Sequence, residues 1–280
     1  MAASPTARDR FAELASRRDE NLGHAELELG ATLIAAEEYP DLDLADVRAA
    51  FDALGERASE RLAGVAEGAA RVERLNRFLF GEEGFAGASE YYDPRNSYLN
   101  EVLARRCGIP ITLAIVYIAT ARRVGIDARG ISFPGHFLVR CAGREERIVD
   151  AFHGRTITLG ECEARLVSAL GAGAELRPEL HLRDASPREI LLRMLANLSR
   201  IFASSGDAER LLACCDRIVL LAPGDPLALR DRAMVYQGLG WFAPAIADLD
   251  SALERAADVE LAETLARLRE VLRARLGHVH

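Results

Sequence analysis

Apolar residues recur at helical spacing in the first part of the chain, from Arg10 to about Arg74. Leu29 and Leu33 fall on one face of a helix, and the later segment PDLDLADVRAAF has the form of a capped helix start. This pattern predicts several short helices. We expect them to form a helical N-terminal cover over residues 1–74.

The hydrophobic pattern changes after this region. Nearly every position in Ile109–Ala119 is apolar or small, which predicts a helix buried on all sides, with Pro110 tolerated in its first turn. The period then falls to two, and turn signals at Pro134-Gly135 and Gly143 separate strand-like segments. These segments are Ile126–Phe133, His136–Cys141 and Arg147–Phe152. An antiparallel sheet packed on the buried helix is therefore expected, in an α+β core over residues 75–184.

Three stretches of this core have a less regular pattern. Phe78–Arg95 is rich in glycine and aromatic residues and is predicted to be an ordered loop. Asn96–Arg106 is predicted to be a short amphipathic helix. Gly154–Asp184 is expected to be less structured.

The last third of the chain repeats with a period of about 34 residues. One copy has its small and large positions at Ala233, Tyr236, Gly240, Ala245, Leu249 and Ala252, and the other at Ser199, Phe202, Gly206, Leu211, Cys215 and Ile218. The pattern resembles the tetratricopeptide repeat over Leu192–Ala257, and Glu260–Leu276 has the apolar stripe of a capping helix. Residues 185–280 are therefore expected to form tetratricopeptide-type helical repeats.

Two interpretations of these repeats stay open. Such a stack presents a concave surface on which a protein or peptide partner can bind. It can equally be a structural buttress for the core, because two repeats offer a small groove and about three are usually needed for independent stability.

Composition narrows the classes of function. The 280 residues carry a net charge of −8 with basic and acidic residues interspersed, which disfavours a nucleic-acid partner. The N-terminal region has no apolar run that could serve as a signal-peptide core, and the longest apolar stretch of the chain, Ile109–Ala121, is too short for a membrane span. The five cysteines form no CxxC pair, so a reducing, cytoplasmic location is expected. No cofactor is expected, and the oligomeric state is left open.

The hairpin of HFLVRCA and RIVDAFH brings two candidate functional residues together. A turn centred on Gly143 would place His136 directly opposite Asp150, with Cβ atoms about 5 Å apart on one face. A carboxylate at that distance can orient an imidazole, as in the base and orienter of a catalytic triad. The alternative is a structural histidine satisfied by a nearby aspartate.

The segments NRFLFGEEGFAG, YYDPRNSYLNEVLARRCGIPITLAIVY and FPGHFLVR resemble the SirB-one family, bacterial proteins that join a transglutaminase-like core to tetratricopeptide repeats. The resemblance extends from about Leu27 to the C-terminus. It implies a papain-related α+β fold with a buried central helix against an antiparallel sheet. It also implies a nucleophile at the start of that helix, followed by histidine and aspartate on adjacent strands.

This chain departs from the transglutaminase-like pattern at the nucleophile. Counting back from Gly125, the position of the nucleophilic cysteine is occupied by Pro110, and Cys107 lies three residues before it. We therefore favour a non-catalytic binding or regulatory protein that engages a protein partner through its core and repeats. The alternative is a cysteine hydrolase or acyltransferase that uses Cys107, His136 and Asp150, with backbone amides near Ile109–Thr112 as oxyanion donors.

A small-ligand site is a further possibility. Its candidate residues precede the buried helix and are Tyr91, Tyr92, Asp93, Arg95 and Asn96. Arg95 would be the natural clamp for a carboxylate or phosphate, or would simply satisfy loop carbonyls.

We expect no metal site. His136, Asp150 and His153 carry suitable donor atoms, but Asp150 and His153 would point to opposite faces of a regular strand.

Overall fold

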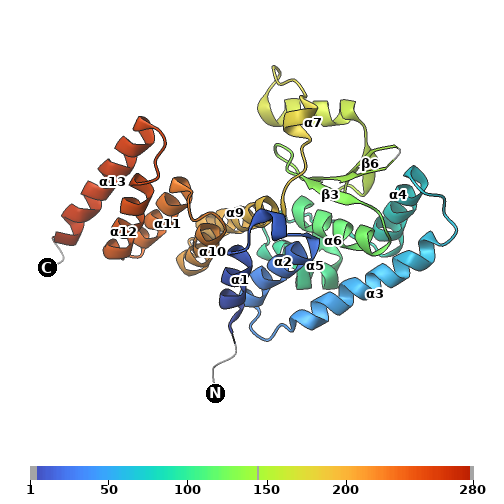
Figure 1. Ribbon diagram of the computed structural model, residues 1–280, viewed down its shortest axis with the longest axis horizontal. Coiled ribbons are helices and arrows are strands. Elements are labelled where there is room, and N and C mark those ends of the chain that lie inside the picture. The colour runs from blue at the N-terminus through green and yellow to red at the C-terminus, as the bar shows by residue number, and fades with distance from the viewer. Residues whose placement is uncertain (1–4, 144, 278–280) are drawn as a thin grey trace. The chain divides into compact units, whose positions relative to one another are not determined.

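The computed structural model describes residues 5–143 and 145–277, which form two compact units (Figure 1). One unit combines the chain up to Arg10 with Arg17–Met194, and the other combines Phe11–Ser16 with the chain from Leu195 onward. The α-helices are α1 (Ala7–Ala15), α2 (His24–Glu38), α3 (Leu44–Leu62), α4 (Ala69–Asn76), α5 (Leu99–Arg105), α6 (Pro110–Arg123), α7 (Leu159–Leu170), α8 (Pro178–His181), α9 (Pro187–Ser205), α10 (Ala208–Leu221), α11 (Pro226–Gly238), α12 (Phe242–Leu253) and α13 (Val259–Gly277). The strands are β1 (Ala86–Gly87), β2 (Cys107–Gly108), β3 (Ala128–Ile131), β4 (Leu138–Cys141), β5 (Arg147–Asp150) and β6 (Arg155–Ile157).

Helices α2 and α3 pack around the end of the central helix α6. Asp43 caps α3 by accepting a hydrogen bond from the amide of Ala45 at 2.8 Å. Gly55 of α3 lets Arg123 of α6 pass close by, because a Cβ at Gly55 would lie 2.7 Å from the Arg123 side chain. Arg123 in turn forms an ion pair with Glu28 of α2 at 2.8 Å. The same arginine thus connects three helices of this unit.

Helix α6 forms the centre of the first unit, with every residue of Pro110–Ala121 buried. It packs against one face of the antiparallel sheet β3-β4-β5-β6, where the Cys141 thiol lies 3.8 Å from the Tyr117 hydroxyl. Helix α7 packs on the other face (Figure 1). The cluster on that side comprises Ile131, Phe133, Leu138, Ile148, Ile157, Cys162, Leu166 and Leu182. The sheet therefore lies between α6 and α7.

The register of the central hairpin differs from the expected one. Val139 pairs with Val149, whereas a turn centred on Gly143 would pair it with Arg147. The shift along β5 is two residues, so each side chain keeps the face that the alternation predicts. His136 lies before β4 begins, and it approaches Asp150 diagonally.

The segments expected to be irregular contain more regular structure than the sequence suggested. Phe78–Arg95 includes most of a π-helix (Arg77–Glu82) and the short strand β1, which pairs in parallel with β2. The expected helix Asn96–Arg106 is a 3₁₀ turn (Pro94–Ser97) followed by α5. Gly154–Asp184 contains β6, α7 and α8, so the expectation of a less structured stretch there was wrong.

From Pro187 onward the described chain contains helices and no strand. Helices α11, α12 and α13 share a core built around small residues that allow close helix approach. Its buried members are Leu229, Ala233, Ala245, Leu249, Ala252, Leu265 and Leu272. The last two belong to α13, which covers the apolar face of α11 and α12. The predicted α+β core followed by tetratricopeptide-type helices is confirmed.

An N-terminal segment also belongs to the repeat unit. Phe11 of α1 has no exposed surface, and its ring lies 5.6 Å from the guanidinium carbon of Arg217 in α10. Arg217 is itself only 2% exposed. Residues separated by most of the chain therefore complete one core.

Among the described residues, no helix combines the length and apolar character that crossing a membrane requires.

The two sides of α7 give a direct test of its packing. Leu166→Ala is expected to lower the free energy of unfolding by about 2–5 kcal/mol, because Leu166 is fully buried between α7 and the sheet. Leu170→Ala on the same helix, where the side chain is 60% exposed, should change it by about 0.5 kcal/mol or less. Urea unfolding of the two variants measures both values, and equal effects would contradict the described position of α7.

Candidate functional site

The Asp150 carboxylate is the centre of the candidate site. It ends β5, and its side chain has no exposed surface. Oδ1 lies 2.9 Å from Nε2 of His136, and Oδ2 lies 2.8 Å from Nδ1 of His153. Arg165 of α7 forms an ion pair with Oδ2, and the backbone amides of Phe152 and His153 donate to Oδ1 at 3.1 and 3.2 Å. Five donors therefore converge on one buried anion.

The charge of this carboxylate is well compensated. Burial opposes ionisation of Asp150, but the hydrogen bonds from His136 and His153 and the positive charge of Arg165 outweigh it. Together they hold the pKa of Asp150 well below its usual range. Asp150 is thus a permanent anion that orients two imidazoles.

A sharp turn brings His153 back to Asp150. Strand β5 ends at Asp150, and residues 151–154 turn before β6 begins. Gly154 completes the turn at φ +67°, and a Cβ at this position would lie 2.9 Å from Phe80. The expectation that Asp150 and His153 point to opposite faces was wrong, because the strand does not continue to residue 153.

A second turn positions His136. Gly135 has φ +68°, so the chain reverses between β3 and β4 just before the histidine. Arg193 of α9 donates to the carbonyl of His136 at 2.6 Å and to that of Phe133 at 3.1 Å. The His136 side chain is 11% exposed. The backbone of this turn is therefore held from a helix more than fifty residues away in sequence.

Phe152 packs beside this pair of histidines. Its ring is perpendicular to that of His136, with centroids 6.1 Å apart. On another side it covers Gly87 of β1, where a Cβ would lie 2.6 Å from the ring. β1 pairs with the strand that carries Cys107, so Phe152 contacts both the imidazole and the strand pair next to the candidate thiol.

Cys107 and the start of α6 are the features on which the catalytic alternative depends. Cys107 lies in β2 and is half-buried, and among the described residues its side chain makes no hydrogen bond or ion pair. Pro110 is the first residue of α6 and has no N–H. The amide of Ile109 already donates to the hydroxyl of Thr112 at 3.1 Å. Two of the amides expected as oxyanion donors are therefore absent or occupied.

The candidate ligand residues form a compact turn of their own. Asp93 caps a 3₁₀ turn by accepting from the amide of Arg95 at 2.9 Å, and the Arg95 guanidinium binds the same carboxylate at 2.7 Å. Asn96 is buried and donates to the carbonyl of Glu90 at 2.6 Å. Tyr91 and Tyr92 are exposed and contact each other edge to face. Ligand binding by this turn stays a prediction, with the donors of Arg95 already directed at Asp93.

Sequence reasoning missed several residues that build the site. Arg165 lies in the stretch expected to be irregular, although Thr158 and Glu161 carry the spacing of a capping box that marks the start of α7. The Thr158 hydroxyl accepts from the amide of Glu161, and the Glu161 carboxylate accepts from that of Thr158. That signal could have located the helix and its arginine. No comparable pattern marks Arg193, because its contacts depend on tertiary packing.

Three side chains of this cluster could hold a metal ion. The donor atoms of His136, Asp150 and His153 all lie within 4.8 Å of one another. Two imidazoles and a carboxylate form a donor set suited to zinc and other transition metals.

Comparison with known proteins places the chain in a family. A family model of the transglutaminase-like superfamily matches residues 45–196, more than half of the chain. The chain belongs to this superfamily. A tetratricopeptide repeat model matches residues 198–277, directly after the transglutaminase-like domain. The two matched regions have the order expected from the sequence.

Individual proteins are also similar to this chain over most of its length. The UPF0162 protein of Xylella fastidiosa strain Temecula1 is 42% identical over 80% of this chain and 82% of its own length. Protein SirB1 of Salmonella typhimurium strain LT2 is 24% identical over 70% of this chain and 73% of its own length. These similarities confirm the resemblance to the SirB-one family. A crystal structure of menin aligns over 94% of this chain and 74% of that chain with a TM-score of 0.44 and 12% identity, too low to bear on function.

The buried anion of the transglutaminase-like domain predicts a pH-dependent stability. The folded pKa of Asp150 is depressed, so its contribution is fully present above the unfolded pKa of about 3.9 and is lost as the pH falls toward the folded value. Asp150→Asn should therefore lower the free energy of unfolding at pH 7 by about 3–5 kcal/mol, and by less at pH 3.

The matched control is Asp127→Asn, which removes the carboxylate of a half-exposed pair with Arg129. Its effect should stay within about 1 kcal/mol at both pH values. Urea unfolding at the two pH values measures each difference. A pH-independent effect of Asp150→Asn would show that the carboxylate does not titrate as described.

Proposed function

We propose that this protein is a non-catalytic, transglutaminase-like binding or regulatory protein that engages a protein partner. The observation that carries the proposal is the start of α6, where a transglutaminase-like enzyme would have its nucleophile. Pro110 occupies that position and has no attacking group. The His136–Asp150 pair is present, but it serves as a structural element that joins the turn before β4 to the end of β5.

The contacts around Cys107 also argue against the enzyme alternative. Its thiol has no described hydrogen-bond partner, whereas the imidazole of His136 bonds to Asp150 and packs against Phe152. A cysteine nucleophile needs a base within hydrogen-bond reach and amides directed at the developing oxyanion. Pro110 has no amide hydrogen, and the amide of Ile109 already donates to Thr112. Two of the expected oxyanion donors are therefore missing.

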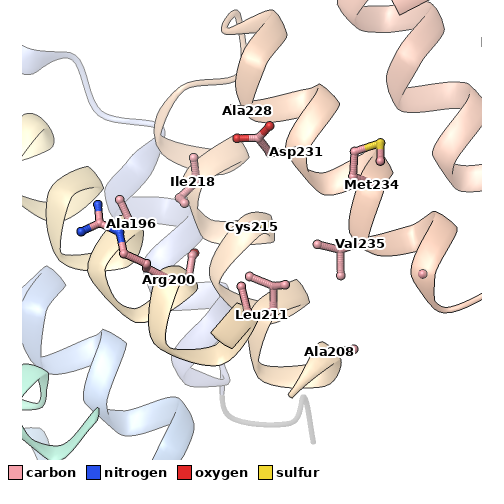
Figure 2. A pocket seen from close by; sticks show the side chains of 13 residues that line it. Ala196, Arg200, Ala208, Leu211, Cys215, Ile218, Ala228, Asp231, Met234 and Val235 are labelled. Atoms are coloured by element: carbon pink, nitrogen blue, oxygen red, sulfur yellow. The ribbon is translucent and has the colours of Figure 1, made fainter. Parts of the chain in front are cut away.

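Support for partner binding comes from the repeats, a module that generally mediates protein–protein interaction. Helices α9, α10 and α11 line an open groove of about 580 Å³ (Figure 2). Figure 2 shows the side chains of Leu211, Ile218 and Val235 facing this groove. Met234 also lines it and is 42% exposed. An apolar, accessible groove of this size fits the apolar side chains of a partner segment. We propose a cytoplasmic location as well, which the five free cysteines support.

The reactivity of Cys107 tests the non-catalytic proposal. We expect iodoacetamide at about pH 6 to label Cys107 no faster than the same cysteine in a short peptide of the surrounding sequence, because no described group activates it. His136→Ala should leave the rate unchanged. Peptide-resolved mass spectrometry gives the rate at each site.

Two buried thiols are internal controls for this assay. Burial raises the pKa of Cys141 to about 12 and that of Cys215 to about 11, so both should be labelled more slowly than Cys107 in the native protein. Fast labelling of Cys107 that His136→Ala abolishes would overturn the non-catalytic proposal and favour the hydrolase alternative.

The groove makes a separate prediction. Met234→Glu should reduce recovery of a specific partner from the native lysate at least tenfold, because it places a charge in an apolar surface. Val271→Glu, at a 50% exposed position on α13 that does not line the groove, should retain the partner. Circular dichroism confirms that both variants are folded. Equal recovery with the two variants would show that the groove is not the partner surface.

A further inference from the structure

We propose that His136, Asp150 and His153 bind one divalent transition-metal ion, for which Zn²⁺ is the probe. The ligands would be Nε2 of His136, one carboxylate oxygen of Asp150 and Nδ1 of His153, which all lie within 4.8 Å of one another. Ligand atoms on a tetrahedral zinc ion, each about 2.0–2.2 Å from the metal, lie about 3.4 Å from one another. Shifts of about 1 Å or less in these side chains would therefore create the site.

The chemistry of the three donors fits such an ion. Asp150 is a buried carboxylate whose charge is already stabilised by its neighbours. The backbone amides of Phe152 and His153 hold its Oδ1, as hydrogen bonds commonly orient a ligating carboxylate. Each imidazole would bind as the neutral tautomer, with its proton on Nδ1 of His136 or on Nε2 of His153. A neutral imidazole then binds the ion without releasing a proton.

Arg165 provides the positive charge in the described structure. Its guanidinium pairs with Oδ2 of Asp150 and lies 3.3 Å from Nδ1 of His153. A metal ion bound to Nδ1 of His153 and to Oδ2 of Asp150 would compete with this guanidinium, because both cations are attracted to the same two atoms. The Arg165 side chain is 26% exposed, so it has a route to solvent. Binding of the ion would therefore displace Arg165 from the carboxylate.

The site would also keep an open coordination position. Three protein ligands leave a fourth position on a tetrahedral ion for water. The His153 side chain is 47% exposed, so water and ions can reach the cluster from that side. This inference does not depend on the proposed binding role, because an ion can bind whether or not Cys107 is reactive.

Zinc titration of the untagged, metal-free full chain tests the proposal. Calorimetry should show one Zn²⁺ per chain at this site, and His153→Ala and His136→Ala should each weaken its affinity at least tenfold. Arg165→Gln should strengthen it at least threefold, because the competing cation is gone. This gain distinguishes a metal site from a purely structural ion pair. If Arg165 and Asp150 form only a structural pair, Arg165→Gln should not increase the zinc affinity.

The other four histidines of the chain provide controls. His24→Ala, His181→Ala and the double substitution of His278 and His280 should leave the affinity of the site unchanged. Co²⁺ in place of Zn²⁺ should give a visible absorption band that His153→Ala removes. Because His153 is half exposed, that variant should fold, which circular dichroism can verify. Absence of saturable binding would overturn the proposal, as would binding that His153→Ala leaves intact.

Discussion

A buried carboxylate with five donors organises the end of the transglutaminase-like sheet at which β4 begins and β5 ends. An ionised group without solvent must be compensated, since an unpaired buried charge costs several kcal/mol. The donors to Asp150 come from the turn before β4, from the turn after β5 and from α7. The charge is therefore fully stabilised only when all three segments are in place.

This requirement gives His136 and Asp150 a structural role that does not depend on a nucleophile. In a triad the aspartate orients the histidine toward an attacking group. Here the same hydrogen bond between His136 and Asp150 joins two turns, and His153 and Arg165 use the second carboxylate oxygen. Replacing His136 would remove one of the five donors to this carboxylate, and replacing Asp150 would remove the acceptor that all five share. The pair therefore stabilises this part of the sheet in a protein that has Pro110 at the start of α6.

The fold could be predicted from the sequence where a pattern is local. The apolar run of α6 and the period of the repeats gave the buried helix and the helical module, since both depend on regular spacing. The hairpin register was displaced by two residues, because a turn of several polar residues does not define its own centre. The pairing of His136 with Asp150 nevertheless followed, since an even shift preserves the face. His153 could not be placed, because its position depends on where β5 stops.

The repeat unit is built from two chain segments that lie far apart in the sequence, and this affects the order in which it can fold. Phe11 contacts the almost fully buried Arg217, so the segment Phe11–Ser16 belongs to a core whose other members are synthesised much later. Domains generally fold as units while the chain is being synthesised. The first unit can form while the chain is still growing, but the helices of the repeat unit have to return to a segment that left the ribosome long before. The core of the second unit can therefore be completed only after its later helices have been synthesised.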